Sequence, residues 1–235
     1  MELPVKQFQT RGEEGYATLF AGAEPDLPGA GTPWADRLRA EAFASYAAQG
    51  LPHRRIEAWK YTDLRSKLTE PFPLARASGP ELTDRDVAAA IGPEMAALHA
   101  YRLVVAGGEL RSSPSDIAAL EQAGAEIVSL TEVLSQPPHW LKGALGKINA
   151  QPDDSVIALN LALMTGGIGL KLRAGASLDR PVHLIHLDVP ERASIVTRNM
   201  ISVEEGASLE LIETYAGQSD HDIQRNVVTE LSLAA

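Results

Sequence analysis

Four glutamates in the second half of the chain are the residues best suited by type to acid–base chemistry: Glu204, Glu205, Glu210 and Glu213. Paired carboxylates hydrolyse glycosidic bonds when they face each other across the bond. Glu204 and Glu205 fall at an expected turn, whereas Glu210 and Glu213 are three residues apart on an expected strand and point to opposite faces. The spacing disfavours a hydrolase. A solenoid enzyme acting on carbohydrate stays open as an alternative, by analogy of fold alone.

Metal and nucleotide sites are disfavoured for similar reasons. His183 and His186 are three residues apart on an expected strand, so their rings point to opposite faces. His221 lies between two aspartates, which is typical of a hydrated loop. The glycine-rich run at residues 166–169 lacks the Lys-Ser or Lys-Thr pair of a phosphate-binding loop. We therefore expect no catalytic residue, no metal ligand and no cofactor bound by this chain.

Composition narrows the class of protein further. The chain of 235 residues has no Cys, and its 31 acidic and 21 basic residues give a net charge of −10. The absence of Cys excludes disulfides, thiolate nucleophiles and thiolate metal ligands. An acidic surface without a dense basic stripe disfavours nucleic acid as a partner. The sequence has no apolar run of membrane-spanning length and no secretory signal, so we expect no membrane contact and a cytoplasmic location.

One segment stands out, the run LPHRRIEAWKYTDL at residues 51–64, because it gathers aromatic and charged side chains in a chain with 5% aromatic residues. It resembles the N-terminal signature of the SufB/SufD family, scaffold proteins of iron–sulfur cluster assembly. The matching residues are Arg54, Glu57, Trp59, Lys60, Tyr61 and Thr62. We expect a structural role, in which Trp59 and Tyr61 wedge under a domain and Arg54 pairs with Glu57. A direct role in cluster or ligand chemistry is the less favoured alternative.

The residues that position this segment are expected to form an N-terminal helical or α+β domain over residues 1–150. Thr32 and Pro33 predict the start of a helix, and Gly50 predicts its end. Thr83 predicts the cap of a second helix, and Gly107-Gly108 predicts a hairpin turn. The other expected elements are helices at 83–91, 117–123 and 131–135 and strands at 101–106, 109–110 and 125–130.

Residues 151–235 are expected to form a second domain of short strands separated by tight turns. The sequence Gly-Ala-Ser-Leu occurs at 175–178 and again at 206–209, a period of 31 residues. A repeat of this kind predicts a solenoid in which each coil buries its apolar face on the next. The resemblance to the SufB/SufD family favours one form of solenoid, a mainly-β right-handed parallel β-helix. A β-sandwich stays open as an alternative, because two copies are few.

The family resemblance extends from about Thr32 to the end of the chain. It includes residues 158–160, Arg198-Asn199 and residues 226–230. The lack of Cys and the moderate length of the N-terminal region favour a SufD-like over a SufB-like protein. Family members continue the β-helix and close with a helical domain, so the resemblance implies that this chain is the N-terminal part with the C-terminal portion missing.

The resemblance implies a scaffold or assembly subunit that acts through protein–protein contacts and is not an enzyme. The implied partners are a SufB-like subunit, which would supply the cluster thiolates, and a SufC-like ABC ATPase, contacted through the missing C-terminal part. A homodimer is a further implied pairing. The iron–sulfur cluster would lie on the assembled complex. A non-catalytic oligomerisation module stays open as a third alternative.

Overall fold

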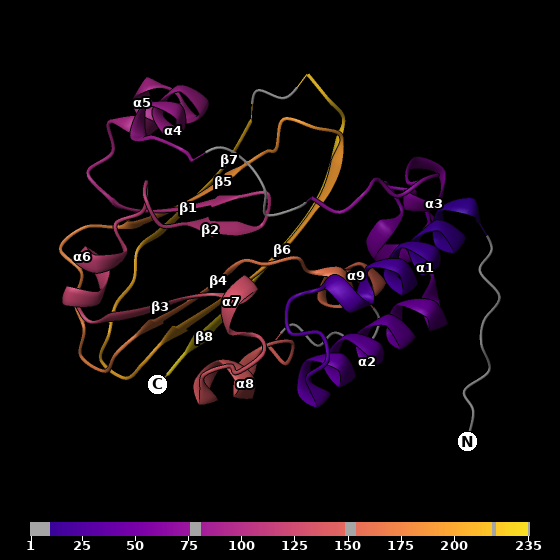
Figure 1. The fold of residues 1–235 in the computed structure, drawn as a ribbon, viewed down its shortest axis with the longest axis horizontal. Coiled ribbons are helices and arrows are strands. Elements are labelled where there is room, and N and C mark those ends of the chain that lie inside the picture. The colour runs from indigo at the N-terminus through magenta and orange to yellow at the C-terminus, as the bar shows by residue number, and fades with distance from the viewer. Residues whose placement is uncertain (1–9, 76–80, 149–153, 218–219, 235) are drawn as a thin grey trace.

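Two four-stranded sheets form the centre of the computed structural model, which describes residues 10–75, 81–148, 154–217 and 220–234 (Figure 1). The first sheet has the order β2-β1-β5-β7 and the second has the order β3-β4-β6-β8. The strands are β1 (Tyr101–Ala106), β2 (Glu109–Arg111), β3 (Ala125–Ser129), β4 (Ile168–Leu172), β5 (Val182–Leu187), β6 (Ala193–Val203), β7 (Leu211–Ala216) and β8 (Ile223–Leu233).

The helices lie around these sheets. Figure 1 shows α1, α2 and α9 together at one end of the molecule, α6 at the other end, and α4 and α5 near the first sheet. Their bounds are α1 (Arg11–Ala23), α2 (Pro33–Gln49), α3 (Leu64–Lys67), α4 (Asp84–Ile91), α5 (Pro93–Ala96), α6 (Ile117–Gln122), α7 (Leu130–Val133), α8 (His139–Ala144) and α9 (Ser155–Leu163), with 3₁₀ turns at Glu24–Asp26 and Glu57–Trp59.

Helix α2 confirms the helix predicted from its cap residues. Thr32 takes the N-cap position, Pro33 is the first helical residue, and Gly50 ends the helix with φ 72°. The left-handed conformation explains why glycine stands there. Tyr46 of this helix is fully buried. Thr83 likewise caps α4 in a reciprocal capping box with Asp86, and Gly107 and Gly108 turn β1 into β2 with φ 60° and 95°.

Two main hydrophobic cores follow from the alternation of side chains along the strands. Leu103 of β1, Leu170 of β4 and Ile201 of β6 pack between the two sheets. Val196 and Met200 of β6 point the other way and pack against the helices. The two sheets therefore share one core, and the second sheet is covered by helices on its outer face.

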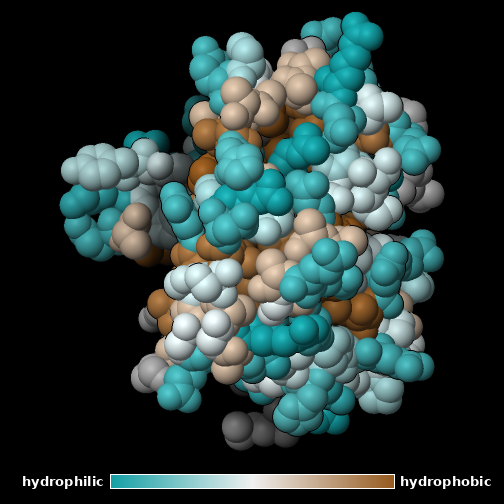
Figure 2. All heavy atoms as spheres, turned by 90° about the vertical axis from the view of Figure 1, so that its left-hand side faces the viewer, coloured by the Kyte–Doolittle hydropathy of each residue, from teal (hydrophilic) through white to brown (hydrophobic). Residues whose placement is uncertain are grey.

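At the end of the molecule that faces the viewer in Figure 2, hydrophobic residues reach the surface between hydrophilic side chains.

The parallel β-helix expected for residues 151–235 is wrong. The strands of this segment divide between two mixed sheets, in which β1 pairs antiparallel with β2 and β3 pairs antiparallel with β4. Strands β1, β2 and β3 precede the segment and complete both sheets, which gives an α+β fold. The expected division between residues 150 and 151 lies outside the described residues.

The 31-residue repeat explains the error. Its two copies lie side by side, because a Cβ on Gly206 would be 3.8 Å from the Cα of Gly175, and Ser177 forms a parallel bridge with Ser208. Strands that follow the two copies, β5 and β7, pair in parallel within one sheet. A repeat therefore predicts correctly that its copies are neighbours. It carries no information on the antiparallel strands that join from elsewhere in the chain.

Candidate functional site: a buried polar network and an exposed signature loop

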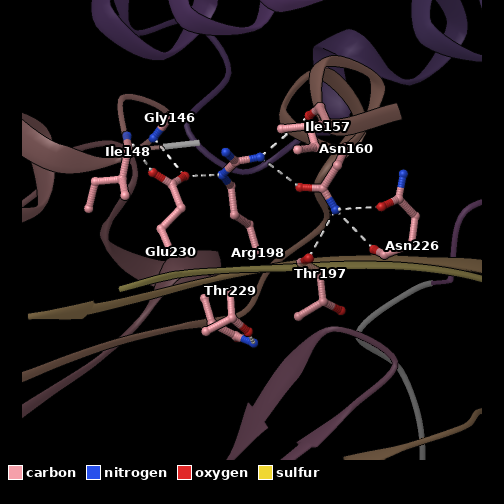
Figure 3. Close-up of polar contacts among 10 residues, drawn as sticks. Gly146, Ile148, Ile157, Asn160, Thr197, Arg198, Asn226, Thr229 and Glu230 are labelled. Carbon is pink, nitrogen blue, oxygen red and sulfur yellow. Dashed lines mark hydrogen bonds and ion pairs between the residues drawn. The ribbon is translucent and has the colours of Figure 1, made fainter. Parts of the chain in front are cut away.

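An ion pair lies buried under the helices, between the second sheet and α9 (Figure 3). Arg198 of β6 is on the face that carries Val196 and Met200, and Glu230 of β8 stands opposite Met200 in the parallel register. The Arg198 Nε donates to the Glu230 Oε1 at 2.5 Å, and the two side chains are 1% and 0% exposed. Burial lowers the pKa of the Arg198 guanidinium, and the Glu230 carboxylate opposes that shift. The pair satisfies two charges that would each be costly to bury alone.

Glu230 also holds the loop that follows α8. Its two carboxylate oxygens accept the backbone N–H groups of Gly146, at 2.9 Å, and Ile148, at 3.1 Å (Figure 3). Charge-assisted bonds of this kind are stronger than those between neutral groups. The Glu230 side chain therefore fixes both a neighbouring strand and a loop.

Asn160 extends the network to α9. Its Oδ1 accepts from the Arg198 Nη1 at 3.0 Å, and its Nδ2 donates to the backbone oxygens of Thr197, at 3.0 Å, and Asn226, at 2.9 Å. Asn226 also bonds α9 through its own Nδ2, which donates to the Val156 oxygen at 3.2 Å. Every one of these groups has a partner within the chain. The arrangement positions helix and sheet relative to each other, and it presents no free nucleophile or acid to a substrate.

A second polar group lies between the two sheets near β7 and β8. His186 is 4% exposed, its ring stacks on that of Tyr215 with centroids 4.8 Å apart, and its Nε2 lies 3.4 Å from the Asn199 Nδ2. Glu213 accepts from the Tyr215 hydroxyl at 2.7 Å and from the Thr229 hydroxyl at 2.8 Å. Burial lowers the pKa of His186 to about 4, so the imidazole is neutral at neutral pH.

The structure keeps apart the residues considered for metal and acid–base chemistry. His183 bonds the Thr214 hydroxyl at 2.7 Å, on the opposite face of β5 from the partners of His186. Glu204 pairs with Lys171 at 2.8 Å, whereas Glu213 bonds within the second polar group. The prediction that the histidines diverge is confirmed. In the described part of the chain, no group of three or more His, Asp or Glu side chains could hold a metal ion.

The glycine-rich run at residues 166–169 serves backbone packing against β6. Gly167 has φ 127°, and a Cβ there would lie 1.8 Å from the Arg198 oxygen. The Arg198 N–H donates to the Gly166 oxygen at 3.0 Å, and the Leu130 N–H donates to the Gly167 oxygen at 2.9 Å. Only glycine allows so close an approach of two backbones.

The signature segment lies on the surface. Tyr61 is 91% exposed and Ile56 42% exposed, and Trp59 is half-buried. Neither Trp59 nor Tyr61 is among the side chains of the hydrophobic clusters of the described residues. The expected wedge is therefore wrong for Tyr61.

The expected ion pair of this segment is also wrong. Arg54 pairs with Asp63 at 3.4 Å instead of with Glu57, and Glu57 pairs with Lys60 at 2.6 Å. Thr62, the last signature residue, donates its backbone N–H to the Trp59 oxygen at 2.8 Å. Turns determine the conformation of residues 53–63, whereas Leu51 at the start of the segment is buried in the hydrophobic core.

Sequence reasoning missed the role of the buried network. Asn160, Arg198, Asn226 and Glu230 were recognised only as positions that resemble the family. A usable signal was present, because Arg198 and Glu230 are opposite charges inside expected strands, and such charges are rarely buried unless paired.

Comparisons with known proteins match most of the chain. The family model described as the SufBD protein N-terminal region matches residues 10–184. A curated iron–sulfur cluster assembly SufBD family protein from Synechocystis sp. is 28% identical over 193 residues. That alignment covers 78% of this chain and 41% of the relative, so the chain spans less than half the length of that protein. None of the helices in the described ranges is long and apolar enough to cross a membrane.

Proposed function

The chain belongs to the SufBD protein family, and on that premise we propose that it is a SufD-like scaffold subunit of iron–sulfur cluster assembly. It acts by binding other proteins and not by catalysing a reaction. The family match over residues 10–184 is the observation that carries the proposal.

The chemistry of the chain supports a scaffold role. Residues 1–235 contain no Cys and so supply none of the thiolates that usually ligate an iron–sulfur cluster, and we assign those thiolates to a SufB-like partner. The buried charges of Arg198 and Glu230 bind each other and hold helix, loop and sheet together. The cluster is cargo of the assembled complex.

The proposed partners supply what this chain lacks. A SufB-like subunit provides thiolates, and a SufC-like ABC ATPase provides nucleotide hydrolysis, because the glycine-rich run of this chain packs against β6. The relative from Synechocystis is more than twice as long as the matched region. We place the contact with the ATPase in the part of the family's length that this chain does not match, and pairing with a second copy is the alternative to pairing with a SufB-like subunit.

A depletion experiment tests the proposal. The gene is silenced in the source organism, and the activity of an iron–sulfur dehydratase is compared with that of a metal-free enzyme of the same pathway. We expect the dehydratase activity to fall, while the amount of its polypeptide stays constant, and to recover when the intact gene is returned. Unchanged dehydratase activity under iron limitation would contradict the proposed function.

A further inference from the structure

The signature loop, residues 53–63, is held in a defined conformation. Backbone N–H groups of Ile56, Trp59 and Thr62 donate to the oxygens of His53, Ile56 and Trp59 at 2.8–2.9 Å. These bonds form consecutive turns along the loop. Such a loop loses little conformational entropy when a partner binds it.

The base of the loop is fixed from below by a buried carboxylate. Glu13 of α1 is 1% exposed, and its Oε1 accepts the Leu51 N–H at 2.9 Å and pairs with the Arg65 Nε at 3.1 Å. Arg65 also donates to the Leu51 oxygen at 2.9 Å, and the Leu64 N–H donates to the Pro52 oxygen at 3.0 Å. Both ends of the loop are therefore tied together and to the helical part of the chain.

This anchored loop presents large side chains to solvent. Tyr61 is the most exposed of the large hydrophobic residues, at 91%, and Ile56 is 42% exposed. The Lys60 Nζ lies 5.3 Å from the centroid of the Tyr61 ring. Tyr, Trp and Arg are the residues that most often dominate the energy of protein interfaces. A rigid loop that presents Tyr61 and Arg54 to solvent, with Trp59 half-buried, has the composition of a docking surface.

The charge of the loop indicates the chemistry of the partner. Residues 53–63 contain three basic side chains, Arg54, Arg55 and Lys60, against two carboxylates, in a chain of net charge −10. The Arg54 side chain is 72% exposed, and a hollow of about 610 Å³ is lined by His53, Arg54, Arg55, Asp63, Arg65 and Ser66. A short acidic segment complements this local charge. A long polyanion, such as a nucleic acid or a membrane surface, would be repelled by the rest of the chain.

We propose that the signature loop docks a short acidic segment of a partner protein, with carboxylates bound by Arg54 and Arg55 and an apolar side chain packed on Ile56 and Tyr61. This inference rests on the proposed scaffold function, because that function implies that the partner is a protein. Its test uses the isolated chain, so that either proposal can fail without the other.

Three tryptophans make the test specific, because Trp59 lies in the loop whereas Trp34 and Trp140 pack against the core that contains Val196 and Met200. In a two-dimensional NMR spectrum of ¹⁵N-labelled protein, each indole N–H gives one signal, and Trp59→Phe assigns the signal of the loop. The probe is a short synthetic peptide of glutamates with two central leucines. A peptide with lysine in place of glutamate is its control. We expect saturable shifts of the Trp59 signal with the acidic peptide only, weakened by added salt.

Matched variants locate the contact. Tyr61→Ala and the double change Arg54→Glu with Arg55→Glu should each weaken binding about tenfold or more, and Tyr61→Phe should retain it. Arg85→Glu is the control, because Arg85 is an exposed arginine on α4, away from α3 in Figure 1. Unchanged Trp34 and Trp140 signals show that each variant is folded.

Four outcomes would overturn the proposal. They are no saturable shift of the Trp59 signal, equal binding of the lysine peptide, equal loss of binding in Arg85→Glu, and binding of anionic phospholipid vesicles in place of the acidic peptide.

Discussion

Arg198 and Glu230 form the ion pair that joins β6 to β8, with the Arg198 Nε donating to the Glu230 Oε1 at 2.5 Å and both side chains almost completely buried. Through Asn160 and the loop at Gly146, the same pair holds α9 and the segment after α8 on the sheet. The position of the helical layer on the second sheet therefore depends on two charges that have no access to water.

Removing one charge of this pair should be strongly destabilising. Glu230→Gln keeps the shape of the side chain but offers one carbonyl oxygen in place of two, so one of the Gly146 and Ile148 N–H groups loses its acceptor. The Arg198 guanidinium also stays buried without its counter-ion. We expect a loss of about 3–5 kcal/mol in the free energy of unfolding, measured by urea denaturation. The double variant Arg198→Met with Glu230→Gln should lose less than the sum of the two single changes.

A surface pair provides the control for that measurement. Lys171 and Glu204 are 2.8 Å apart with side chains 20% and 38% exposed. Glu204→Gln should cost much less than Glu230→Gln, because water screens exposed ion pairs. Equal losses for Glu230→Gln and Glu204→Gln would contradict the account of the buried network.

Gly167→Ala should destabilise the protein although it adds a single methyl group. The added Cβ would lie 1.8 Å from the Arg198 oxygen, and the backbone φ of 127° is unfavourable for alanine. We expect a loss of roughly 2 kcal/mol or more in thermal or urea unfolding. Gly143→Ala in α8, where no atom lies within 4 Å of the added Cβ, should be neutral or stabilising. A reversed order would show that the close backbone approach at Gly167 does not exist.

Stability should fall with acidification in a window set by His186. Burial lowers the pKa of His186 from 6.5 to about 4, so between these values the unfolded chain binds a proton that the folded chain does not. The contribution of the neutral His186 to the free energy of unfolding is fully present above pH 6.5. It is lost as pH falls toward 4, by about 3 kcal/mol at the acid end. Urea unfolding at a series of pH values measures this slope, and His186→Gln should reduce it. His139→Gln, at an exposed site on α8, should not.

The outer strands should make the isolated chain self-associate. Strands β7 and β8 each end a sheet in the described structure, and Leu231 and Leu233 of β8 are 47% and 67% exposed. Unpaired strand edges with apolar side chains recruit other chains. Light scattering should show concentration-dependent association that Leu231→Lys lowers and Leu98→Lys, at an exposed site in a loop, does not. A monomer at every concentration, with strong amide protection along β8, would contradict this prediction.

Local signals in the sequence predicted local structure well. Thr32 and Gly50 gave the bounds of α2, Thr83 gave the start of α4, and Gly107-Gly108 gave the hairpin, because cap and turn residues act within a few positions of themselves. The partners of the strands are not local. Nothing near Ala125 indicates that it stands opposite Leu172, so the mixed sheets could not be predicted.

The candidate site was harder to predict than the fold for the same reason. Arg198 and Glu230 are 32 residues apart and meet only because β6 and β8 pair in one register. The 91% exposure of Tyr61 is also unusual for its residue type, because tyrosine is usually at least half-buried. It follows from the turns that direct the signature loop away from the helices, which no periodicity in the segment reveals.

The central claim, that this chain is a scaffold subunit and not an enzyme, is tested most directly by sedimentation of the purified chain with a SufB-like subunit from the same organism. The account predicts a defined complex of the two proteins that forms without nucleotide, and no ATP hydrolysis by this chain alone. Two species that sediment independently at all concentrations, or ATP hydrolysis by the isolated chain, would contradict it.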